Sequence, residues 1–168
     1  MSRNGHDRAP WRWNPEAALL GALRDYARHR GRTDTWSVLR RKWARLRHRV
    51  WSIVTASDIQ PGVCLGERVR LPHPTGVVIH RNAVIGSDCM LMQQVTLGQR
   101  ADGAAPVLGE GVYVGAGARV LGRVTIGDGA RIGANAVVLV DVPPGCTAVG
   151  VPARVIGREE AARIQEAA

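Results

Sequence analysis

The chain has 168 residues, of which 45% are hydrophobic and 22% are charged, and its formal net charge is +9. This composition belongs to the soluble globular class and predicts one principal domain. No stretch approaches the roughly 18 uninterrupted apolar residues of a membrane span, and the N-terminus lacks the apolar core of a signal peptide. Cys64, Cys89 and Cys146 are scattered, which excludes a disulfide framework. We therefore expect a cytoplasmic protein.

The positive charge is concentrated in the first third of the chain. Residues 1 to 50 contain 13 Lys or Arg against four Asp or Glu, whereas residues 51 to 168 contain ten of each. A basic segment of this kind can contact an anionic partner, or it can be a solvated helix face, which is the commoner case. We keep an anionic partner for this segment as a candidate and expect no nucleic acid.

Two helices are expected in residues 1 to 56, after a poorly ordered arm over residues 1 to 13. Asn14 is a good cap for a helix that starts at Pro15 and runs to about Arg30, and Thr33 or Asp34 can cap a second helix. The second helix has apolar residues at spacings of three and four, namely Trp36, Leu39, Trp43, Leu46, Val50 and Val54. We expect this apolar stripe to cover a surface of the protein, with the basic residues on the outer face.

From Ile59 the pattern changes to a period of six residues. Thirteen aliphatic positions fit it: Ile59, Leu65, Leu71, Ile79, Ile85, Leu91, Leu97, Leu108, Val114, Val120, Ile126, Ile132 and Val138. Seven of them are followed by Gly, and the position four residues later is Val, Ala, Cys or Thr. One large and one small inward side chain per six residues predict a short strand and a tight corner, three of which make one coil of a parallel β-helix.

We assign the β-helix to residues 57 to 157. The coils at its two ends must be capped because each coil shields only its neighbours. The N-terminal helices are expected to cap one end, and residues 158 to 168 to form a short helix at the other.

Four segments carry a resemblance to a known family: LPHPTGVVI at 71 to 79, QQVTLG at 93 to 98, VGAGARVLG at 114 to 122 and VPPGCTAVGVPARVIG at 142 to 157. They resemble the serine acetyltransferase family of hexapeptide-repeat transferases. The resemblance implies a left-handed parallel β-helix and a homotrimer with active sites between subunits. It also implies an O-acetyltransferase that uses acetyl-CoA as donor and no metal.

The same resemblance implies that His73 is the general base and that Asp58 orients it. A neutral hydroxyl attacks a thioester only if its proton is removed as the new bond forms, and imidazole is suited to that task. His80 follows an inward isoleucine, so we interpret it as a bystander. A zinc site of three histidines is disfavoured because the coils contain only His73 and His80.

For the cofactor, the resemblance implies contacts at Gly98, Ala116 and Ala134 with the pantetheine arm, and at Arg154 with the nucleotide end. Ala116 and Ala134 are eighteen residues apart, which is one full coil, so they are expected to stack. Small residues also occur in this fold simply because they permit tight corners.

The loop that binds the acceptor departs from the family's pattern. The family's Arg-His-Pro sequence, which helps to hold the amino-acid acceptor, is replaced here by Ala104, Ala105 and Pro106. Arg100 could substitute for the lost cation. We therefore expect a hydroxyl of a sugar, a polysaccharide or a specialised metabolite as acceptor, with serine O-acetylation for cysteine biosynthesis as the alternative. A non-catalytic β-helix that docks through its basic arm is a third class of function.

Overall fold

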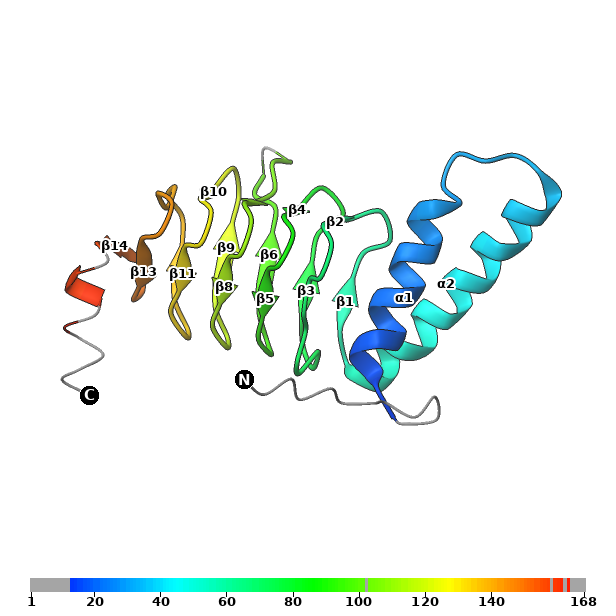
Figure 1. The fold of residues 1–168 in the computed structure, drawn as a ribbon, viewed down its shortest axis with the longest axis horizontal. Coiled ribbons are helices and arrows are strands. Elements are labelled where there is room, and N and C mark those ends of the chain that lie inside the picture. Colours follow the sequence, from blue (N-terminus) through cyan, green and yellow to red (C-terminus); the bar gives the residue numbers. More distant parts are fainter. Residues whose placement is uncertain (1–12, 102, 158, 162, 164–168) are drawn as a thin grey trace, which may run out of the picture.

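The fold of the protein is known from a computed structural model, which describes residues 13–101, 103–157, 159–161 and 163. Two helices at the N-terminal end are followed by a parallel β-helix whose coils stack along the long axis of the molecule (Figure 1). The predicted arm lies outside the described residues except for Trp13, whose ring lies 5.3 Å from that of Trp51.

The helices begin where their capping residues predict. Helix α1 spans Pro15–Arg28, and the Asn14 side chain accepts a hydrogen bond from the Ala17 backbone N–H. Helix α2 spans Thr35–Thr55 and is capped by Asp34. The predicted helix starts are thus confirmed.

The β-helix has three faces, each formed by one parallel sheet of very short strands. In the described residues the first sheet has the order β1-β3-β6-β9-β12, the second β10-β7-β4-β2, and the third β14-β13-β11-β8-β5, with β14 antiparallel. The strands are β1 Asp58–Ile59, β2 Cys64–Leu65, β3 Val78–Ile79, β4 Val84–Ile85, β5 Met90–Leu91, β6 Thr96–Gly98, β7 Val107–Leu108, β8 Tyr113–Val114, β9 Arg119–Leu121, β10 Thr125–Ile126, β11 Arg131–Ile132, β12 Val137–Val138, β13 Thr147–Val149 and β14 Arg154–Ile156.

The core follows the predicted period of six. All thirteen aliphatic positions are buried except Leu65, which is half-buried. The small inward position was predicted wrongly at two places. Thr75 and Ala101 are exposed because each lies in a loop inserted between coils, and the inward positions fall to Val77 and Pro106 instead.

The seven glycines that follow the aliphatic positions have a steric explanation. At each of them, an added Cβ would lie closer than 3.0 Å to an atom of the next coil or of a neighbouring segment; the seven are Gly66, Gly86, Gly98, Gly109, Gly115, Gly127 and Gly133. Real Cβ atoms essentially never approach that closely. Glycine at these corners therefore permits the close stacking of the coils.

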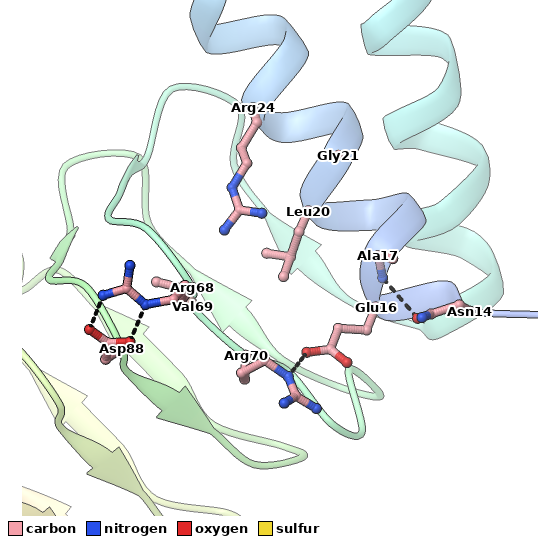
Figure 2. Close-up of a pocket in the computed structure, with 10 residues that line it drawn as sticks. All are labelled: Asn14, Glu16, Ala17, Leu20, Gly21, Arg24, Arg68, Val69, Arg70 and Asp88. Carbon is pink, nitrogen blue, oxygen red and sulfur yellow. Dashed lines mark hydrogen bonds and ion pairs between the residues drawn. The ribbon is translucent and has the colours of Figure 1, made fainter. Parts of the chain in front are cut away.

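Helix α1 caps the first coil, as predicted. Leu19, Leu20 and Leu23 are buried and belong to the same core as the coil residues. Figure 2 shows α1 beside the first coils, with the Glu16 carboxylate bonded to Arg70 Nε at 2.8 Å. At the other end, residues 159–161 and 163 are helical, and the remainder of the predicted tail helix lies outside the described residues.

Helix α2 packs in a different orientation from the predicted one. Its buried residues are Ser37, Ala44, His48 and Thr55, whose modest size lets α2 lie close to α1. The apolar stripe from Trp36 to Val54 is exposed. The expectation that this stripe covers a surface of the protein is wrong, because α1, together with Trp51 on another side of α2, packs against the core at the end of the β-helix.

The first prediction concerns the glycine corners. An alanine Cβ at Gly86 would collide with the backbone carbonyl of Gly109 in the next coil, whereas a Cβ at Gly157 meets nothing within 4 Å. Gly86→Ala should lower the free energy of unfolding by about 2 kcal/mol, and Gly157→Ala should change it by less than about 0.5 kcal/mol. Chemical denaturation of both variants measures the difference. Equal stabilities would show that the coils are not packed this closely.

The second prediction concerns His48, which is 8% exposed. Burial lowers the pKa of His48, and a hydrogen bond with the Ile59 backbone and the charge of Asp58 offset this only in part. The unfolded chain therefore binds a proton at His48 more readily than the folded chain does. The contribution of neutral His48 to folding stability is fully present above the ordinary pKa of 6.5 and is lost as the pH falls below it.

Replacing His48 by Gln removes this titration. We expect the melting temperature of the wild type to fall more steeply than that of His48→Gln between about pH 7.5 and 5.5. Thermal unfolding followed by circular dichroism measures both slopes. Parallel pH profiles for the two proteins would contradict a buried neutral imidazole at this position.

Candidate active site

One edge of the β-helix gathers three of the six predicted site residues, His73, Ala116 and Ala134. This edge, which we call the His73 edge, consists of residues 72–76, 92–94, 115–117 and 133–135, where the third sheet passes into the first, and of residues 150–153, which continue the row and connect the third-sheet strands β13 and β14. Backbone hydrogen bonds join its successive levels. They run from Gln94 N to Thr75 O at 2.9 Å, from Gly117 N to Gln93 O at 2.9 Å, from Asn135 N to Ala116 O at 2.8 Å and from Val137 N to Gly150 O at 3.0 Å.

The loop that carries His73 is held by both N-terminal helices. The Leu71 backbone N–H donates to Glu16 Oε1 of α1 at 2.9 Å. The Gly76 backbone N–H donates to the carbonyls of Thr55 and Ala56, at the end of α2, at 3.3 and 3.2 Å. The imidazole of His73 is exposed. The helices thus fix the backbone of the loop while the His73 side chain stays open to a substrate.

Asp58 lies in the segment next to this loop. Its backbone N–H donates to the carbonyl of Val77 at 2.8 Å, which aligns the start of β1 with the end of the His73 loop. Both Asp58 and His73 are exposed, and within the described residues no hydrogen bond or ion pair joins their side chains. The catalytic pairing of His73 with Asp58 therefore remains a prediction.

Ala116 and Ala134 occupy consecutive levels of the His73 edge, as their spacing of one coil predicts. Arg154 begins β14 directly after the last level of the edge and is exposed. Levels of a parallel β-stack are about 4.8 Å apart, so the edge runs for roughly 19 Å from the His73 loop to residues 150–153. Gly98 is not on the edge itself, because it lies at the far end of strand β6.

The loop with the altered acceptor sequence lies on a different edge. Residues 99–106 connect the first sheet to the second, at the opposite end of the short first-sheet strands from His73. Beside this loop is a cavity of about 340 Å³, and its lining includes Arg100 and Arg123. Arg100 was a candidate from the sequence, whereas Arg123 was not, because only the stacking of the coils brings Arg123 beside Arg100. Within one chain, neither arginine is placed on the His73 edge.

One polar group near the His73 edge, Gln93, was not predicted from the sequence. Gln93 lies between the levels of His73 and Ala116, and its Oε1 atom is buried without a hydrogen-bond partner in the described part of the chain.

His80 uses its Nδ1 atom to accept a hydrogen bond from the Asn82 backbone at 3.2 Å, which stabilises a local turn. In the part of the chain that the structure describes, no group of three or more His, Cys, Asp or Glu residues could hold a metal ion.

Comparisons with known proteins agree on one family. A family model described as bacterial transferase hexapeptide (six repeats) matches residues 105–139. The chain is 41% identical over 128 residues to the serine acetyltransferase of Escherichia coli (strain K12), covering 74% of this chain and 47% of that protein. It also resembles a soybean serine acetyltransferase solved in complex with serine, with a TM-score of 0.69 and 39% identity over 82% of this chain and 56% of that one.

A solved serine acetyltransferase in complex with CoA is similar to the same degree, with a TM-score of 0.69 and 35% identity over 82% of this chain and 55% of that chain. These matches overturn the expected sugar or specialised-metabolite acceptor, because the relatives and structural neighbours are serine acetyltransferases. The expectation gave too much weight to the loss of the Arg-His-Pro sequence. The alternative acceptor, serine, is the one that the comparisons favour.

The chain spans about half the length of the curated relatives that it matches. On the fold, the repeats and the sequence identity together, the chain belongs to the serine acetyltransferase family of hexapeptide-repeat acyltransferases.

Proposed function

We propose that this protein is an acetyl-CoA-dependent serine O-acetyltransferase. The observation that carries the proposal is the His73 edge, which has an exposed histidine at one end, the small residues Ala116 and Ala134 on consecutive levels, and Arg154 directly after the last level. A row of small residues leaves backbone groups accessible to an extended ligand, and the CoA-bound neighbour supports CoA as that ligand.

In the proposed reaction His73 acts as general base. Its neutral imidazole accepts the proton of the serine hydroxyl while the hydroxyl oxygen attacks the thioester carbonyl carbon of acetyl-CoA. The tetrahedral intermediate then collapses, the C–S bond breaks and the CoA thiol leaves, so that no acyl-enzyme forms. Asp58 lies in the segment next to the His73 loop, and a carboxylate there would stabilise the imidazolium that forms during attack.

The proposed position of acetyl-CoA along the His73 edge follows from the size and charge of the residues there. The pantetheine arm lies across Ala116 and Ala134, where larger side chains would block its approach to the backbone. The guanidinium of Arg154 meets the phosphates of the nucleotide end, because phosphate groups pair well with arginine. Gly98 lies at the far end of β6, beside residues 99–106, so it would adjoin the reacting thioester only from the adjacent subunit.

The carboxylate of serine requires a cationic partner. Within one chain, the candidates Arg100 and Arg123 lie on a different edge of the β-helix from His73. A homotrimer solves this problem, because the residue 99–106 edge of one copy can face the His73 edge of its neighbour. Arg100 and Arg123 then approach serine from the adjacent subunit.

Three free cysteines, Cys64, Cys89 and Cys146, fit a reducing cytoplasm as the place of action.

His73→Ala tests the proposed base. With serine and acetyl-CoA as substrates, we expect the rate of CoA thiol release to fall about 100- to 10,000-fold. His80→Ala is the histidine control, because His80 follows the opposite end of β3 and its side chain accepts a hydrogen bond only from the local turn. A rate for His73→Ala close to that of the wild type, or an equal loss in both variants, would refute His73 as the base.

Arg100→Ala tests the proposed carboxylate partner. Loss of a charge-assisted hydrogen bond should raise the KM for serine about 10- to 100-fold and leave the KM for acetyl-CoA unchanged. Arg100→Lys should restore part of the affinity. Arg24→Ala serves as the control, since Arg24 lies in the separate cavity beside α1 (Figure 2). If neither Arg100→Ala nor Arg123→Ala changes the serine KM, the carboxylate is held elsewhere.

A further inference from the structure

The most unusual surface of the molecule is the outer face of α2. Six large apolar side chains on this helix are between 50% and 81% exposed: Trp36, Leu39, Trp43, Leu46, Val50 and Ile53. Their spacing alternates between three and four residues over five turns of helix, so they form one continuous strip. We call this strip the α2 apolar face. Contiguous exposed apolar surface of this extent marks an interaction site.

The α2 apolar face points away from the rest of the protein. The buried residues of α2, such as Ala44 and His48, lie on the opposite side of the helix and pack toward α1. Helix α1 in turn lies between α2 and the first coil, with Leu19 and Leu23 in the β-helix core (Figure 1). Nothing in the described part of the chain covers the α2 apolar face, which occupies the N-terminal end of the molecule.

Basic residues border this face on both sides. At 100° per residue, Arg40 and Arg47 fall along one border of the strip, and Lys42 and Arg49 fall along the other. The helix sequence TWSVLRRKWARLRHRVWSIVT contains no acidic residue. Of the four border residues, Arg47 forms an ion pair with Asp25 at 3.0 Å. The partner that fits this face must therefore accept apolar side chains in its centre and positive charges at its margins.

The charge pattern disfavours a second α2 helix as that partner. The 3-4 spacing could in principle form a coiled-coil seam, in which the residues beside the seam of one helix face those of the other. Here these flanking residues are Arg and Lys on both borders, so parallel and antiparallel pairing would both bring like charges together. Like charges facing each other across an interface are destabilising.

We propose that the α2 apolar face binds the surface of an anionic phospholipid membrane. Trp36 and Trp43 are suited to the boundary between headgroups and acyl chains, because their rings are amphipathic. The basic borders reach the headgroup phosphates, as in interfacial amphipathic helices. Among the described residues no helix is long and apolar enough to cross a membrane, so α2 lies on the surface and does not span it. This inference does not depend on the identity of the acetyl acceptor.

Vesicle flotation of the full chain tests the proposal. The probes are vesicles of phosphatidylcholine alone and vesicles in which about a third of the lipid is phosphatidylglycerol. We expect the wild type to float with the anionic vesicles and not with the neutral ones, and the bound fraction to fall as salt screens the charges. Equal binding to both kinds of vesicle, or no binding to either, would overturn the proposal.

Variants on the exposed surface separate the two contributions without affecting the core. Trp43→Ser should weaken binding to anionic vesicles about tenfold or more, whereas Val84→Ser, an exposed apolar change on the β-helix, should not. Replacing Lys42 and Arg49 by Gln should also weaken binding about tenfold. The same loss of charge at Arg24 and Arg28 on α1 should have a smaller effect.

Analytical ultracentrifugation without lipid separates the membrane from a second copy of the chain. We expect Trp43→Ser to keep the oligomeric mass of the wild type and its rate of CoA release. A lower mass for this variant would show that another chain covers the α2 apolar face. Vesicle binding that all the variants leave unchanged would show that lipid binds a different surface. Either result would overturn the proposal.

Discussion

The close stacking of coils is the constraint on which the rest of the structure depends. Each coil buries one large and one small side chain per face, and glycine at the corners permits backbone atoms of adjacent coils to approach. Because every level repeats the same turn, residues one coil apart fall on the same edge. The row formed by Ala116 and Ala134 is a direct result of this repetition, and so is the straight path from the His73 loop to Arg154.

The two helices couple this regular scaffold to the site. The His73 loop is two residues longer than the six-residue repeat, so it departs from the regular corners of the stack. Glu16 of α1 and the carbonyls at the end of α2 bind its backbone at Leu71 and Gly76. The N-terminal segment therefore both closes the core and positions the His73 loop, while its outer face remains available for another surface.

Much of the fold could be predicted from the sequence because the period of six and the helix caps are local signals. Asn14 and Asp34 cap their own helices, and an inward residue such as Ile85 is defined by its neighbours in the chain. The direction of the α2 apolar face could not be predicted in this way. Helical periodicity shows that Trp36 and Trp43 share a face, but not whether the protein supplies a surface to cover it.

The site was predicted less completely because it depends on contacts between distant segments. The row of Ala116 and Ala134 follows from the repeat, but Arg123 comes beside Arg100 only when coils stack. The acceptor was predicted wrongly, because the loss of the Arg-His-Pro loop sequence does not reveal what replaces its cation. A neighbouring subunit can supply a group that no single chain places near His73.

Complementation between impaired subunits, assayed at serine concentrations well below the KM of Arg100→Ala, tests the central claim that one site is shared by two copies of the chain. His73→Ala and Arg100→Ala chains would be co-expressed with different affinity tags, and the mixed trimers purified and assayed for serine-dependent CoA release. If His73 and Arg100 of adjacent subunits form one site, each mixed trimer contains one complete site of three, so the purified mixed trimers should have about a third of the wild-type sites. Activity no greater than that of the two variants measured separately would contradict a shared site and the serine-binding account built on it.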